Sequence, residues 1–141
     1  MSVLRSIGAV LLSLLVAFAL LFAVEGISAI LHPWPEDFGG TQEEVAQQVA
    51  TYPAWILAVL GGTGWGGIMF LATWLATRLG SNRHAGHGYG IAAVFFILII
   101  FNMSQLPYPL WFWVFMLIVQ PIAAYLGTST GAKSRNESSA S

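Results

Sequence analysis

Long uncharged stretches dominate the hydrophobic pattern of this chain and set the elements that it predicts. A helix needs about 20 apolar residues to cross a hydrocarbon core of about 30 Å. The pattern offers such stretches at 4–31 and 53–77, and residues 88–132 carry no charge. One straight helix over 88–132 would measure about 67 Å. We therefore expect this third stretch to fold back on itself.

The reversal is predicted at Pro107 and Pro109, which lack amide donors and disfavour helix just before them. This places a third span at 89–106 and a fourth at 108–127. Residues 128–141 are Ser, Thr, Gly, Ala, Asn and charged residues with nothing to bury, so we expect a disordered cytoplasmic tail there.

A short helix is predicted between the first two spans. Thr41 and Glu44 fit a capping box, in which the threonine caps a helix and the glutamate reaches back to its amide. Val45, Val49 and Tyr52 then recur on one face. Such an amphipathic helix suits the outer membrane surface or the mouth of a bundle.

Composition supports a membrane environment. Of the 141 residues, 57% are hydrophobic and 8% are charged, whereas soluble domains carry roughly 25% charged residues. We predict an all-α membrane protein, an antiparallel bundle of four transmembrane helices with a short extracytoplasmic amphipathic helix, in one domain over 1–127. The lipid bilayer is its expected partner, and no nucleic acid is expected. The absence of cysteine excludes disulfides and thiolate metal sites.

Charge segregation sets the expected orientation. All five basic residues fall on one side of the predicted threading. Four of the six acidic residues lie in the first loop, on the other side: Glu36, Asp37, Glu43 and Glu44. By the positive-inside rule both termini are then cytoplasmic, in the inner (plasma) membrane. The alternative is a signal peptide cleaved after 17–19, although the apolar run continues past that site, which signal peptides avoid.

The second span contains a glycine-rich string, GGTGWGG, at 61–67. Its G-x-G-x-x-G pattern binds dinucleotides only after a strand and at the start of a helix, a context that a membrane span does not provide. Ala58, Gly62 and Gly66 recur every four residues, so we interpret them as a helix-packing face. Trp65 is expected to pack as a knob into another helix; the alternative is that it lines a ligand cavity.

Glu25 and His32 are the strongest candidates for chemistry. They are spaced to lie near one face of a helix, with Ser28 between them. A carboxylate within a membrane is costly and usually faces protein or a water-filled cavity. We predict that Glu25 faces the bundle near Asn102 and Gln105. The alternative is a hydrated helix end without a function.

Other motifs point away from enzymatic chemistry. His84 and His87 form a pair, but a structural metal site usually needs four ligands and no cysteine is available. We expect a basic turn near lipid headgroups instead of a metal site. The sequence has no H-E-x-x-H, G-x-S-x-G or P-loop pattern. No catalytic residue and no cofactor is predicted.

Three strings, HPWPEDFG, TRLG and FNMSQLPYPLWFW, resemble those of uncharacterised small four-span bacterial membrane proteins. The resemblance covers most of the chain and implies a bacterial inner-membrane setting, but it implies no activity. The favoured function is a non-enzymatic scaffold or accessory subunit, which associates through the glycine-rich helix as a homo-oligomer or within a larger membrane complex. One alternative is a small transporter or proton-coupled carrier using Glu25 and His32. The other is an intramembrane enzyme or cofactor-binding protein.

Overall fold

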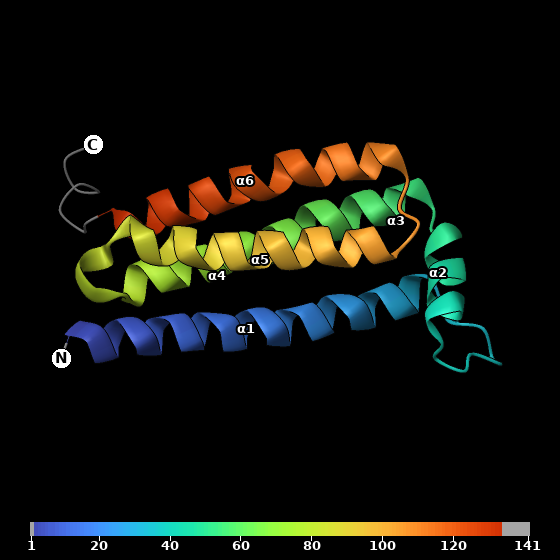
Figure 1. Cartoon of the computed structure of the whole chain (residues 1–141), viewed down its shortest axis with the longest axis horizontal. Helices are drawn as coiled ribbons and strands as arrows, with labels where there is room; N and C mark the ends of the chain where they lie inside the picture. The colour runs from blue at the N-terminus through green and yellow to red at the C-terminus, as the bar shows by residue number, and fades with distance from the viewer. Residues whose placement is uncertain (1, 134–141) are drawn as a thin grey trace.

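In the computed structural model, which describes residues 2–133, long helices lie side by side and a short helix crosses one end of them (Figure 1). In chain order, the first helices are α1 (Ser2–Leu31), α2 (Gln42–Ala50), α3 (Ala54–Val59), the π-helical η1 (Leu60–Trp65) and α4 (Gly66–Leu79). A 3-10 turn, η2 (Ser81–Arg83), leads to α5 (Ala85–Gln105) and α6 (Leu110–Ala132). We call the end that α2 crosses the α2 end, and the other the far end.

Four stretches of helix are long and apolar enough to cross a membrane: Val3–Leu31, Ala54–Leu79, Ala85–Gln105 and Leu110–Ala132. The second of these joins α3, η1 and α4 into one continuous span. The prediction of four apolar helices is therefore confirmed, and they are compatible with an integral membrane protein.

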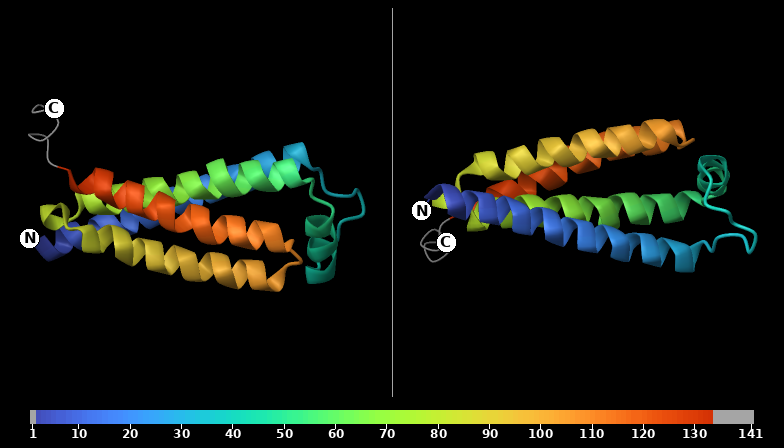
Figure 2. Two further views of the ribbon diagram at one scale, coloured as in Figure 1. Left: turned by 90° about the horizontal axis from the view of Figure 1, so that it is seen from above. Right: turned by 60° about the horizontal axis from the view of Figure 1, so that its bottom comes forward.

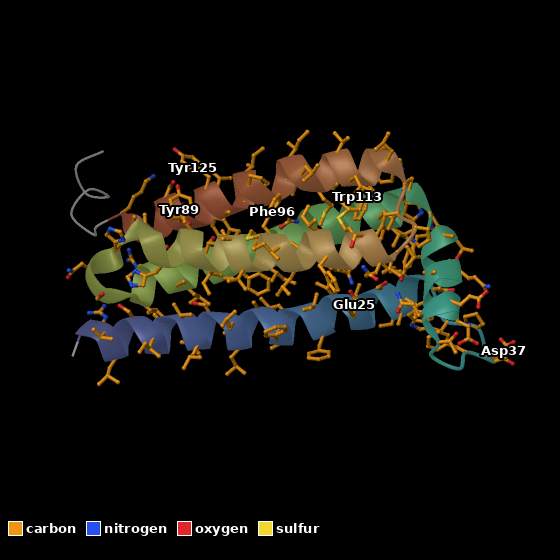
Figure 3. The ribbon with its side chains drawn as sticks, viewed as in Figure 1. Glu25, Asp37, Tyr89, Phe96, Trp113 and Tyr125 are labelled. Carbon is orange, nitrogen blue, oxygen red and sulfur yellow. The ribbon has the colours of Figure 1, made fainter. Side chains whose placement is uncertain are left out.

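Side chains are distributed as expected for a protein dissolved in lipid. Large apolar side chains of α1 point away from the bundle (Figure 3), and Phe22 and Ile30 are 78% and 77% exposed. Thr73 and Gln120, by contrast, are completely buried. A water-soluble protein hides its large apolar side chains and rarely exposes a large contiguous apolar surface. The outer surface of this bundle therefore suits hydrocarbon.

Small residues let α6 approach α4 closely. A Cβ on Gly131 would come within 2.8 Å of the Trp74 carbonyl oxygen, and one on Gly127 would collide with the Phe70 carbonyl. This four-residue glycine spacing is typical of close helix pairs in membranes. Because these contacts continue along α4, α6 extends to Ala132. Residues 128–132, expected in a disordered tail, are therefore helical, and 134–141 lie outside the described residues.

The helices spread apart toward the α2 end. Figure 2 shows α1 beside α4 and α5 beside α6, with the two pairs diverging toward the end that α2 crosses. α4 packs against all three other spans, whereas α1 contacts α5 at few points. The spread leaves space beneath α2 and along the side of the bundle between α1 and α5.

Polar contacts hold α1 at the far end. The Arg5 Nε donates to the Leu79 carbonyl (2.9 Å), and the hydroxyls of Ser6 and Ser81 are hydrogen-bonded (2.6 Å). His87 Nε2 also bonds the Ser6 hydroxyl (2.9 Å). The start of α1 is thus tied to the turn between α4 and α5.

Candidate functional site

A cavity of about 330 Å³ lies beneath α2, between α1, η1, α5 and α6. Small-molecule sites in proteins usually measure about 300–1,000 Å³ and combine apolar walls with a few polar groups. The polar side chains on its wall are Glu25, Ser28, Tyr52, Asn102 and Tyr108. We call it the capped cavity, because α2 covers it.

A close contact between α1 and η1 places Glu25 in the cavity wall. A Cβ on Gly64 would come within 3.1 Å of Val24 Cγ1, so the glycine lets α1 approach η1 at this level. Glu25 follows Val24 and lies on the side of α1 that faces the other helices (Figure 3). Among the described residues that line the cavity, none is Lys, Arg or His. The wall therefore supplies this carboxylate with no cationic partner.

Aromatic rings make up much of the remaining wall. Trp34, Tyr52, Trp65, Tyr108 and Phe112 all line the cavity, and the Tyr108 and Phe112 ring centroids are 5.0 Å apart. The faces of such rings attract cations, because the ring quadrupole places negative charge there. A carboxylate and several aromatic rings thus line the same hollow.

Tyr108 is held as a neutral phenol. Burial raises the pKa of Tyr108 to about 12, and the negative charge of Glu25 contributes in the same direction. The Tyr108 hydroxyl therefore remains available as a hydrogen-bond donor to a ligand in the cavity.

α2 forms through the capping box that the sequence predicts. The Thr41 hydroxyl accepts from the Glu44 amide (3.2 Å), and the Glu44 carboxylate accepts from the Thr41 amide (2.9 Å). This prediction is confirmed. Val45 and Val49 of α2, with Tyr52 just after it, line the capped cavity, so the predicted apolar face of this helix covers the bundle mouth.

Three contacts fasten α2 to the end of α1. Ser28 bonds the Tyr52 hydroxyl, His32 Nε2 bonds Thr51 Oγ1 (2.8 Å), and Gln48 Nε2 donates to the His32 carbonyl (3.2 Å). The Thr51 hydroxyl donates its proton to the Gln48 carbonyl (2.7 Å), so His32 Nε2 is the donor to Thr51. α1 and α2 together therefore make one wall of the cavity.

The structure brings together three of the five polar residues singled out in the sequence. Glu25, Ser28 and Asn102 line the capped cavity. His32 and Gln105 are outside its lining. His32 follows the last residue of α1 and turns toward the end of α2, while Gln105 is the exposed last residue of α5.

The glycine stripe of the second span is in contact with α6 of the same chain. A Cβ on Gly62 would come within 3.2 Å of the Phe115 ring, and one on Gly66 within 3.0 Å of Val119 Cγ1. Ala58 is half-buried in α3. The glycines of the stripe are thus covered from within the molecule, and a partner helix would have to use another face.

The five aromatic residues that line the site were not assigned to it from the sequence. Trp65 lines the capped cavity, which is the alternative left open for it above, and the π-helical turn carries it there. Tyr52 and Tyr108 each stand next to a proline where the chain enters or leaves a span. That position was a usable signal, because aromatic residues at span ends meet where loops close over a bundle.

The described residues contain no evident metal site. Across residues 2–133, no group of three or more His, Asp or Glu side chains lies close enough to hold a metal ion. His84 caps α5 by accepting from the Gly86 amide (3.0 Å), and His87 Nδ1 bonds the His84 carbonyl (2.9 Å). These two histidines therefore shape the turn at the far end.

Comparison with protein-family models, with curated proteins and with solved structures finds no match. The resemblance of three strings to small four-span bacterial membrane proteins therefore assigns no role to any residue. We base the function on the capped cavity itself.

Proposed function

We propose that this integral membrane protein binds a small organic cation in the capped cavity as the first step of carrying it across the membrane. The observation that carries the proposal is the Glu25 carboxylate, on a membrane-spanning helix, in the wall of an aromatic cavity that supplies it with no basic residue. An isolated carboxylate in a membrane is costly. A cationic ligand offsets that cost by pairing with it.

The lining favours an organic cation over a metal ion. Calcium takes about 6–8 oxygen ligands at short distances, whereas the oxygen-bearing side chains of this lining are one carboxylate, three hydroxyls and the Asn102 amide. A cation over an aromatic face gains roughly 0.5–2 kcal/mol, more when desolvated. An ammonium carrying apolar groups satisfies both the carboxylate and the rings.

The orientation we propose is an antiparallel bundle with both termini cytoplasmic in a bacterial inner membrane. Its support is the gathering of basic residues at the far end, where Arg78 and Arg83 both donate to the Lys133 carbonyl (2.9 and 3.0 Å) and Arg5 donates to α4. Positive charge marks the cytoplasmic side. α2 and the capped cavity are then extracytoplasmic, so the ligand is taken up from outside.

To carry the ligand across the membrane, the Glu25 carboxylate must release one positively charged partner and take up another. Without a basic neighbour in the lining, its carboxylate is neutralised either by the ligand cation or by a proton, and the two compete for one site. His32 has no part in this exchange, because its ring bonds Thr51 and serves to fasten α2. The proton-coupled carrier hypothesis used both Glu25 and His32. The proposal retains Glu25 in that role and gives His32 a positioning role instead.

The test compares two ligands of one shape. Phenyltrimethylammonium and neutral tert-butylbenzene differ in charge alone, and Trp34 and Trp65 in the lining report their binding by fluorescence of the purified protein. We expect the cation to bind tighter by about tenfold or more, the effect of roughly 1.4 kcal/mol from charge and ring contacts. Equal binding of the two compounds, or binding of neither, would overturn the proposal.

A further inference from the structure

A second hollow opens on the side of the bundle. It measures about 210 Å³ and lies between α1 and α5 against α4, with Phe18, Ile68, Phe95 and Leu98 in its walls. We call it the lateral cleft. The Phe18 and Phe95 rings, 6.2 Å apart, bridge α1 and α5 within it.

The lateral cleft adjoins the capped cavity. Leu21, Trp65 and Asn102 line both hollows, so they share a boundary at the level of η1. The shared side chains come from α1, the π-helical turn and α5. A molecule that occupies both would pass between these three side chains.

The two hollows differ sharply in chemistry. The capped cavity holds Glu25 and several hydroxyls. Among the described residues that line the lateral cleft, only Asn102 and the indole N–H of Trp65, both at the boundary, carry polar side-chain groups. Phe18 and Leu98 are 44% and 46% exposed, on the outer surface that suits hydrocarbon. The cleft thus accepts an apolar group and opens toward the lipid.

We infer that the ligand is a cationic amphiphile, with its charged head in the capped cavity beside Glu25 and its single alkyl chain in the lateral cleft. The inference rests on the proposed function and names its substrate class. Two features select this occupant: a polar hollow lies beside an apolar one, and the two share a boundary at Leu21, Trp65 and Asn102. An amphiphile already in the bilayer enters sideways between α1 and α5.

Filling the cleft tests the inference without touching the head site. Leu98 lines the lateral cleft but not the capped cavity, and its exposure makes Leu98→Trp compatible with folding. Ile97→Trp is the matched control, because Ile97 is 67% exposed and belongs to neither lining. The probes are decyltrimethylammonium and phenyltrimethylammonium, titrated calorimetrically into protein in phosphatidylcholine nanodiscs, with empty nanodiscs as the blank for partitioning.

We expect Leu98→Trp to weaken the binding of decyltrimethylammonium about tenfold, because an alkyl chain that enters a filled site causes overpacking. Phenyltrimethylammonium should bind this variant as it binds the wild type, and Ile97→Trp should leave both affinities unchanged. If Leu98→Trp changes the affinity for neither ligand, the alkyl chain lies in bulk lipid, and the inference fails while the proposed head site stands. If Glu25→Gln still binds decyltrimethylammonium like the wild type, the cleft holds ordinary acyl chains and the inference also fails. If the wild type binds neither probe, the proposed function itself is wrong.

Discussion

Two glutamates near the α2 end have different surroundings and therefore different roles. The exposed Glu44 carboxylate accepts hydrogen bonds from the backbone amides of Thr41 and Gly39 (2.9 and 3.1 Å), and these bonds lower its pKa. Glu25 lies in a cavity wall without a basic neighbour among the described lining residues. The first carboxylate is occupied by the fold, and we propose that the second pairs with a ligand.

The lowered pKa of Glu44 gives a pH prediction for α2. A carboxyl with a folded-state pKa below its ordinary 4.5 stabilises the fold above that value, and the contribution is lost as pH falls through the folded pKa. We expect NMR titration to give a Glu44 midpoint below 4.5, and Thr41→Ala to move it up toward the ordinary value. A wild-type midpoint at or above 4.5, or no response to Thr41→Ala, would contradict the capping geometry.

The contact between α4 and α6 depends on the absence of side chains at glycine. A Cβ on Gly127 would collide with the Phe70 carbonyl and the Thr73 hydroxyl, and backbone atoms cannot turn aside as a flexible side chain can. Gly67, in α4, has nothing within 4 Å of the place where a Cβ would lie. The two glycines therefore differ in their tolerance of one added methyl group.

We predict that Gly127→Ala lowers the free energy of unfolding by about 1–3 kcal/mol, the usual range for overpacking. Gly67→Ala, the matched control, should leave stability within about 0.5 kcal/mol of the wild type. Unfolding in mixed micelles with increasing SDS, followed by circular dichroism, measures both. Equal stability of the two variants would mean that α4 and α6 are not in close contact at Gly127.

How far each element is predictable depends on the range of the contacts that form it. The four apolar stretches and the Thr41–Glu44 capping box are local signals, and both lead to the observed helices. The π-helical turn η1 and the extension of α6 to Ala132 are not local, because each depends on which helix packs alongside. The site follows the same rule. Glu25 stands out by its cost in a membrane, whereas Trp65 and Tyr108 join it only once α2 and α5 are in place.

The whole molecule is polar at its two ends and open along one side. At the far end, α1 is tied to the turn between α4 and α5, and at the α2 end it is tied to α2. Between these ties α1 packs on α4 and leaves the lateral cleft beside α5. The arrangement places a capped cavity at one end and an apolar cleft beside it on the side of the bundle.

The proposed orientation makes a direct prediction for the intact molecule. Reporter fusions after Gly80 and at the C-terminus should be active as cytoplasmic fusions, and a fusion near Gly40 should be active as an external one, because the basic residues lie at the far end. Alkaline phosphatase and green fluorescent protein, fused at each position in turn, give opposite signals for the two sides. A cytoplasmic signal after Gly80 with an external C-terminus would require an odd number of spans between them and would contradict the bundle.

The most direct measurement is the affinity of the purified protein for phenyltrimethylammonium before and after Glu25→Gln, a change that keeps the shape of the side chain and removes its charge. Glu43→Gln is the matched control, since Glu43 is an exposed residue of α2 outside the cavity lining. We predict that Glu25→Gln weakens binding by about tenfold or more, because the variant no longer attracts the charge of the ligand and a tenfold loss corresponds to about 1.4 kcal/mol. Glu43→Gln should bind like the wild type. Unchanged affinity in a folded Glu25→Gln protein, or an equal loss in both variants, would contradict the role of Glu25 as the counter-ion of the capped cavity.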